Sequence, residues 1–355
     1  MNYSPFMGFS LFGVHSTRFN VYRILDGGRY NDNLSPDFYN ATHSVDGYHG
    51  EYDFGTNIKS KPISLSCFGE NITESQYRQL RRWLSPKNRG KLILDESPYK
   101  AYTVGLERVA NFSFLPVNDG AGSFVYTGKF ELNLIAYDPY AYSVFDSLDE
   151  VEYDKGYFYN SGLLYASLLP DTTFSNISDN KSVILYTGGT ANSNVNVRIN
   201  GMGDELTIKN ITTDQYFTLR KTPSLETFEV DANYGQCRLN GLLASDYHDG
   251  TYLQLAGTDR VDHYESVSFT NGDDITSFSI DTMLQDDIIG KYIFMQGDRY
   301  KIIDKLNDRQ LKLDNAFRGD TGLYNIVIVD ANEVIITGAN LNIANLEFLY
   351  KYTYI

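Results

Sequence analysis

The chain has 355 residues, of which 42% are hydrophobic and 21% charged, a composition typical of a globular protein with two or three domains and not of a disordered one. No apolar run approaches the ~18 residues that span a bilayer, and the N-terminus does not have the pattern of a secretory signal, so we expect synthesis in a cytoplasm without membrane insertion. The net charge of −15 falls entirely on residues 146–355, because residues 1–145 carry 14 Lys and Arg against 14 Asp and Glu. This acidity argues against sequence-specific nucleic-acid binding, which needs Lys and Arg to displace counterions.

Short strands are predicted along the N-terminal part, at 21–25, 63–67, 91–94 and 130–136. The 29 Tyr and 21 Phe residues favour strands, and the last of these segments alternates apolar and polar side chains. In the second strand Cys67 shares a face with Ile63 and Leu65, which predicts a buried thiol. Cys237 lies in a different predicted domain from Cys67, and we expect it to be a buried thiol in the core of that domain.

One helix is predicted, between Thr73 and Pro86. Thr73 and Gln76 have the spacing of a capping box at the helix start. Trp83, the only tryptophan, is expected to anchor a core. An apolar stripe runs along the helix at i, i+3 and i+7, formed by Tyr77, Leu80 and Leu84.

The tyrosine-rich, acidic segment 138–156 is interpreted as the connection between domains. Beyond it the sequence predicts strands at 183–186, 195–199, 206–208 and 324–329. The glycines of 201–203 do not complete a dinucleotide-binding fingerprint, and we predict a hairpin turn there. Further discontinuities fall near 257–262 and 330–338.

No spacing matches a catalytic, nucleotide-binding or metal-binding motif. The adjacent acids at 273–274 and 286–287 are interpreted as solvated loop residues, and they do not form the acid and base pair of a glycoside hydrolase. We therefore predict no catalytic residue, no cofactor and no metal, and a protein that is not an enzyme. The five histidines are scattered, at His15, His43, His49, His248 and His263.

Several segments of the N-terminal part occur in a recognisable order: 19–24, the glycine-rich turn 46–50, 61–65, the helix ending in RWL, LILDESPY at 92–99 and DPYAY at 138–142. In this order they resemble the siphophage distal tail protein family, Dit. The resemblance implies a homohexameric ring at the distal end of a phage tail, through which DNA passes. Its partners would be the tail tube protein and tail-tip, tail-fibre or receptor-binding proteins, and the chain would be made in the host cytoplasm and reside in the virion.

The resemblance also implies a mainly β fold. Residues 1–145 would form the ring-forming β-sandwich domain with one α-helix. A galectin-like β-sandwich would follow in two pieces, 146–261 and 333–355, with its first and last strands near 160–162 and 346–352. After Gly257 the sequence departs from the shorter family pattern, and we interpret residues 262–332 as a small β module inserted into that sandwich, since loop tips tolerate inserted domains.

An alternative function remains open, that of a carbohydrate-binding accessory protein that contacts host cell-wall glycan through its C-terminal domains. Aromatic rings stack on sugars, and the candidate contacts are Tyr234, Tyr247, His248 and Tyr264. Sugar platforms usually favour tryptophan, however, and this half of the chain has none.

Overall fold

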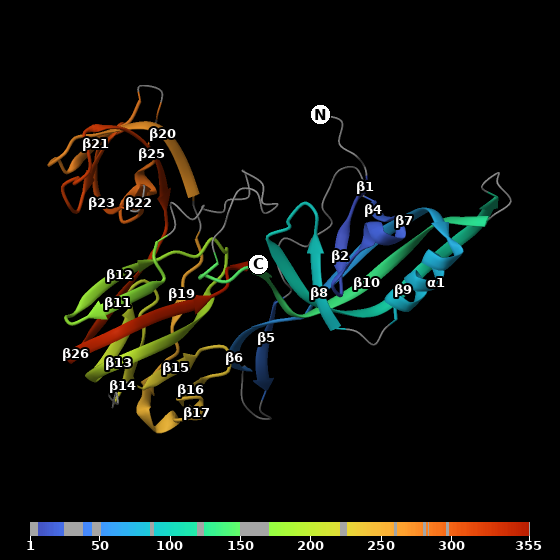
Figure 1. Ribbon diagram of the computed structural model, residues 1–355, viewed down its shortest axis with the longest axis horizontal. Helices are drawn as coiled ribbons and strands as arrows, with labels where there is room; N and C mark the ends of the chain where they lie inside the picture. The colour runs from blue at the N-terminus through green and yellow to red at the C-terminus, as the bar shows by residue number, and fades with distance from the viewer. Residues whose placement is uncertain are drawn as a thin grey trace. The chain divides into compact units, whose positions relative to one another are not determined.

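The computed structural model describes residues 6–24, 38–44, 51–85, 89–118, 124–149, 170–220, 226–258, 261–279, 282, 284–295 and 298–354. The chain divides into two compact units, Met1–Val144 with Tyr354–Ile355, and Phe145–Thr353. Strands dominate both units, and α1 (Glu74–Trp83) is the one α-helix of the described residues (Figure 1). The predicted mainly β class is confirmed.

The N-terminal unit is built on a nine-stranded sheet, and β5 (Phe38–Ser44) pairs with β6 (Glu51–Ile58) as a separate ribbon. Strand β27 (Thr353–Tyr354) pairs with β10 off the main path of the sheet. The order along that path is β1 (Phe6–Met7), β4 (Val21–Ile24), β7 (Lys61–Thr73), β10 (Phe124–Ser143), β9 (Lys100–Asn118), β8 (Arg89–Leu94), β2 (Phe9–Leu11) and β3 (Val14–His15).

The start of α1 has the predicted capping box. The Gln76 backbone N–H donates to the Thr73 hydroxyl at 3.3 Å, and the Thr73 N–H donates to the Gln76 side chain at 3.0 Å. Trp83 is buried, as predicted, and its indole N–H donates to the Leu11 carbonyl at 2.9 Å. Its ring contacts those of Phe9 and Phe19, so the helix is fixed against the strand β2 and the 3-10 turn η1 (Ser16–Phe19).

The second unit contains a ten-stranded sheet whose two halves share the long strands β13 (Ser193–Asn210) and β26 (Asn332–Tyr350). We call this body, residues 170–258 and 332–353, the sandwich. Whether it has a galectin-like topology stays a prediction. One half adds β11 (Thr173–Ile177), β15 (Thr227–Asp231), β16 (Gln236–Leu239) and β17 (Leu242–Leu243). The other half adds β12 (Lys181–Leu185), β14 (Gln215–Leu219), β18 (His248–Gly250) and β19 (Gln254–Leu255).

One prediction about a chain break is wrong, and another needs narrower bounds. The predicted hairpin turn at 201–203 lies inside β13, where the pairing with β26 shifts register. A Cβ on Gly201 would lie 2.5 Å from the Ile343 Cα, so the glycine allows a close approach of two strands and does not form a turn. Of the predicted connection 138–156, residues 138–143 continue β10, and the boundary between the two units falls directly after them, between Val144 and Phe145. The predicted turn at 46–50 and strand at 160–162 lie outside the described residues.

A closed six-stranded barrel forms the remainder of the second unit, and Figure 1 shows it in orange to red beside the sandwich. Its first and last strands pair with each other, from Val261↔Val329 to Phe269↔Gly322, so the segment leaves and rejoins the sandwich at neighbouring points. The strands are β20 (Val261–Phe269), β21 (Ile275–Ser277), β22 (Tyr292–Met295), β23 (Asp298–Asn307), β24 (Gln310–Leu313) and β25 (Gly322–Val329).

Candidate functional site

The four predicted glycan-contact residues do not come together on one surface. Tyr264 belongs to the barrel, where its ring packs edge-on against Phe278 at 5.1 Å. The other three belong to the sandwich. There Tyr247 lies in η4 (Ser245–Tyr247), with its ring 5.9 Å from that of Phe228.

His248 is held in an aromatic stack between Phe217 and Tyr252, at centroid distances of 5.7 and 4.7 Å. Burial lowers the pKa of His248, which favours the neutral ring. Tyr234, in the turn between β15 and β16, is 76% exposed. It is therefore the one residue of the four that presents most of its ring to solvent, and the glycan contacts stay a prediction.

A second candidate surface is the far end of the β9–β10 hairpin, residues 111–118 and 124–129, here called the hairpin end. Strand β9 pairs with β8 only from Ala101 to Gly105, so in the described residues its part from 107 to 118 has no strand partner on the side away from β10. Four large apolar side chains are exposed on the hairpin end, namely Phe112 (39%), Leu115 (67%), Val117 (48%) and Phe124 (58%).

The two faces of the hairpin end differ. On one face Tyr77 of α1 stacks on Tyr126 at 4.5 Å and contacts the rings of Phe112 and Phe114. Because successive strand residues point to opposite faces, Leu115 and Val117 lie on the other face. No pattern of catalytic or ligand-binding residues marks this surface in the sequence, and only its run of apolar residues could have identified it.

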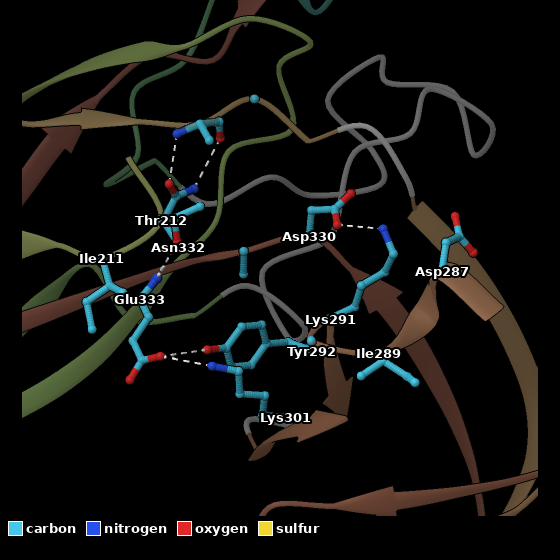
Figure 2. A pocket seen from close by; sticks show the side chains of 14 residues that line it. Ile211, Thr212, Asp287, Ile289, Lys291, Tyr292, Lys301, Asp330, Asn332 and Glu333 are labelled. Carbon is cyan, nitrogen blue, oxygen red and sulfur yellow. Dashed lines mark hydrogen bonds and ion pairs between the residues drawn. The ribbon is translucent and has the colours of Figure 1, made fainter. Parts of the chain in front are cut away.

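A pocket of about 420 Å³ lies between the sandwich and the barrel (Figure 2). Two ion pairs line it: the Lys291 ammonium lies 2.6 Å from the Asp330 carboxylate, and that of Lys301 lies 3.1 Å from the Glu333 carboxylate. The Tyr292 hydroxyl also donates to Glu333, at 3.3 Å. Because the cations already have carboxylate partners, this arrangement serves to join two bodies better than to bind a charged ligand.

Opposing pKa shifts mark the pair of Lys301 and Glu333. Burial raises the pKa of Glu333, but hydrogen bonds from Lys301, Ser182 and Tyr292, together with the Lys301 charge, outweigh it and hold this pKa below its usual value. Burial lowers the pKa of Lys301, and the Glu333 carboxylate and Tyr292 more than compensate, so that this pKa is raised. Both groups are therefore stabilised in their charged forms.

One wall of the pocket is held by a buried amide. The Asn332 side chain is 2% exposed; its carbonyl accepts from the Ala256 N–H at 2.7 Å and from the Asn210 amide at 3.0 Å. Its NH₂ donates to the Ala256 carbonyl at 3.1 Å. Asn332 thus ties together the points where the chain leaves the sandwich for the barrel and returns.

The described residues contain no group of three or more His, Cys, Asp or Glu that could hold a metal ion. In the same part of the chain no helix has the length and apolar character needed to cross a membrane. Cys67 and Cys237 are both buried and unbridged, in agreement with the predicted buried thiols.

Comparison with solved structures gives similarity over nearly the whole chain at low identity. The Dit protein of phage SPP1, described as a paradigm of the hub adsorption apparatus in phages infecting Gram-positive bacteria, is 11% identical, with a TM-score of 0.44 over 92% of this chain and 99% of that one. Two structures of the phage P2 baseplate in its activated conformation, with Ca and with Sr, are also 11% identical, each with a TM-score of 0.29 over 94% of this chain and 98% of the other. No curated protein matches the chain.

The family comparison is specific to the N-terminal unit. Residues 12–136 match the family described as phage tail protein RIFT-related domain. The matched segment runs from the residue after β2 into β10 and includes α1 and the hairpin end. Residues 12–136 therefore match a phage tail RIFT-related domain, which confirms the resemblance of the N-terminal part to siphophage distal tail proteins.

Proposed function

We propose that six copies of this chain close into a ring through the N-terminal domain and form the hub at the distal end of the tail. The ring would join the tail tube to baseplate, fibre or receptor-binding proteins and let DNA pass. The number of copies and the neighbouring proteins follow from the resemblance to distal tail proteins.

The observation that carries the proposal is the hairpin end. It lies within the phage tail domain and exposes four large apolar side chains on two strands, with Leu115 and Val117 on the face away from α1. Burying a fully exposed side chain of this size stabilises by about 1.5–3 kcal/mol, so covering the four partly exposed ones would contribute several kcal/mol per subunit. A second copy of the chain is the partner that a closed ring supplies to every subunit.

The charge distribution also supports the proposal. Subunits of a ring lie close together, and like net charges on neighbouring copies repel. The N-terminal residues 1–145 are neutral, whereas the remaining residues carry 16 Lys and Arg against 31 Asp and Glu. A neutral ring would also hold passing DNA less tightly than a basic one.

Sedimentation velocity of the full chain tests the role of the hairpin end. The parent should sediment as a species of about six times the 40.3 kDa of one chain. Leu115→Asp with Val117→Asp should release monomers, because burying carboxylates in an apolar contact is unfavourable. The matched control, Leu242→Asp with Leu243→Asp, changes two exposed apolar residues of the sandwich and should keep the parent mass. A hairpin variant that assembles like the parent would contradict the proposed contact.

Glycan binding is the second candidate, and the exposure of Tyr234 supports it. The glycine that follows it, Gly235, lies close to the Tyr252 ring, which itself stacks on His248, so the turn that carries Tyr234 adjoins a fixed aromatic stack. In pull-downs with host cell-wall fragments, Tyr234→Ala should reduce retention of the full chain. The control Tyr137→Ala, at an exposed tyrosine of the N-terminal unit, should not. Failure of the parent chain to bind host walls would remove this candidate.

A further inference from the structure

Strand β22 of the barrel is buried on both of its faces. Ile293 and Met295 point into the barrel core, as expected for alternate residues of a strand. Tyr292 and Phe294 point outward, yet they are only 6% and 1% exposed. Something other than the barrel must therefore cover them.

The outward residues of the two neighbouring strands extend this face. On β25, Val327 pairs with Phe294 and Val329 with Tyr292, and these valines are 1% and 0% exposed. On the other side, β23 places Arg299 beside Phe294 and Lys301 beside Tyr292. The result is an apolar centre with a cationic margin, here called the docking face: Val327, Val329, Tyr292, Phe294, Arg299 and Lys301.

The sandwich provides complementary groups for the apolar centre and for Arg299. Tyr186, itself 1% exposed, meets Phe294 edge-on, with centroids 6.1 Å apart and ring planes at 80°. The Arg299 guanidinium donates to the Ile184 carbonyl at 3.5 Å and lies 3.4 Å from the Asp171 carboxylate. An aromatic ring, a strand carbonyl and a carboxylate of the sandwich thus oppose the docking face.

Glu333 connects the two bodies most directly. It lies on β26, and one carboxylate oxygen accepts from Ser182 of the neighbouring strand β12 at 3.1 Å. The other oxygen accepts from Lys301 and Tyr292 of the barrel (Figure 2). One side chain therefore bridges two sandwich strands to two barrel strands.

Charge complementarity explains why two acidic bodies meet here. Residues 262–332 carry 7 Lys and Arg against 13 Asp and Glu, so the barrel segment is acidic like the rest of the C-terminal part. Such bodies repel on average. Arg299 and Lys301 stand on the docking face itself, where they meet Asp171 and Glu333.

The connecting segments are also fixed. Asn332 holds both segments through its bonds to Ala256. The Thr258 hydroxyl donates to the Thr187 carbonyl of the sandwich, and also to the Asp330 carbonyl at 3.3 Å. The barrel therefore begins and ends within a few residues of anchored backbone.

We propose that the barrel is held rigidly against the sandwich through the docking face. Glu333 provides the main contact, so that the two bodies move as one rigid body. A barrel on a flexible tether would expose the aromatic rings and valines of the docking face to water and separate its cations from their carboxylates. A rigidly attached barrel instead keeps its remaining surface in one orientation relative to the sandwich. The inference is independent of ring formation.

Distances between spin labels on the two bodies test whether the barrel is rigidly attached to the sandwich. Leu323→Cys places a label on an exposed position of the barrel, and Ser175→Cys places one on β11 of the sandwich. The native thiols are buried, so labelling is selective. Mixing labelled with excess unlabelled full-length chain confines the measured distances to single chains, whether or not rings form.

The parent should give one narrow distance distribution. Phe294→Asp, and separately Glu333→Lys, should widen it at least about twofold because each disrupts the docking face. Phe294 does not belong to the barrel core, and circular dichroism checks that each variant remains folded. The control Lys312→Gln, which breaks an exposed ion pair with Asp274 inside the barrel, should leave the distribution narrow. A broad parent distribution, or narrow ones in both folded variants, would overturn the proposal.

Discussion

Replacing Asn332 by alanine should destabilise the second unit by more than the loss of one small polar side chain usually does. The side chain is 2% exposed and makes three hydrogen bonds, two to the backbone of Ala256 and one from Asn210. Each such bond contributes about 1 kcal/mol net, and buried groups left unpaired add to the loss, so we expect about 3 kcal/mol in total. With a typical urea dependence, this lowers the unfolding midpoint by about 1 M.

The chain offers an internal control for this measurement. Trp83, the only tryptophan, lies in the N-terminal unit, so its fluorescence follows that unit, whereas circular dichroism follows both. Asn332→Ala should shift the dichroism transition and leave the fluorescence transition unchanged. Asn325→Ala, which removes one exposed hydrogen bond in the barrel, should change stability by less than about 0.5 kcal/mol. An Asn332 variant as stable as the Asn325 variant would show that the hydrogen bonds of Asn332 do not stabilise the second unit.

Three further changes test the local structure. Thr73→Ala removes the acceptor for the Gln76 N–H and should cost about 1 kcal/mol, seen as an earlier fluorescence transition in urea. Gly201→Ala places a Cβ 2.5 Å from the Ile343 Cα and should lower the dichroism midpoint more than Asn325→Ala does; an unchanged midpoint would show that β13 and β26 can separate there. Burial raises the pKa of the Cys237 thiol to about 11 from an ordinary 9.0, so the unfolded thiol ionises first and stability should fall as pH rises from about 9 to 11. Cys237→Ser should flatten that part of the stability profile, and an identical slope in the variant would contradict this assignment.

The helix and the N-terminal strands were predictable because their signals are local. The capping box at Thr73 and Gln76 requires only a spacing of three residues, and the burial of Trp83 follows from its place beside an apolar stripe. The distal tail resemblance was likewise predictable from segments in order, and the family match to residues 12–136 confirms it.

The predictions failed where a distant strand decides the outcome. Gly201 has a turn-like sequence context, but its role is set by Ile343 on a strand more than a hundred residues later. Short segments at 195–199 and 206–208 were predicted as separate strands because nothing local shows that β13 continues between them. Asn332 and Glu333 look like ordinary polar residues of a domain boundary, and only their partners across the barrel junction give them a role.

Negative-stain electron microscopy of the purified full-length chain tests whether it forms a hub. Closed rings with six-fold symmetry are expected, and the double substitution at Leu115 and Val117 should abolish them. If the parent chain gives only single monomers even at high protein concentration, the claim that the N-terminal domain forms a hub is contradicted. Open filaments in place of closed rings would contradict it as well.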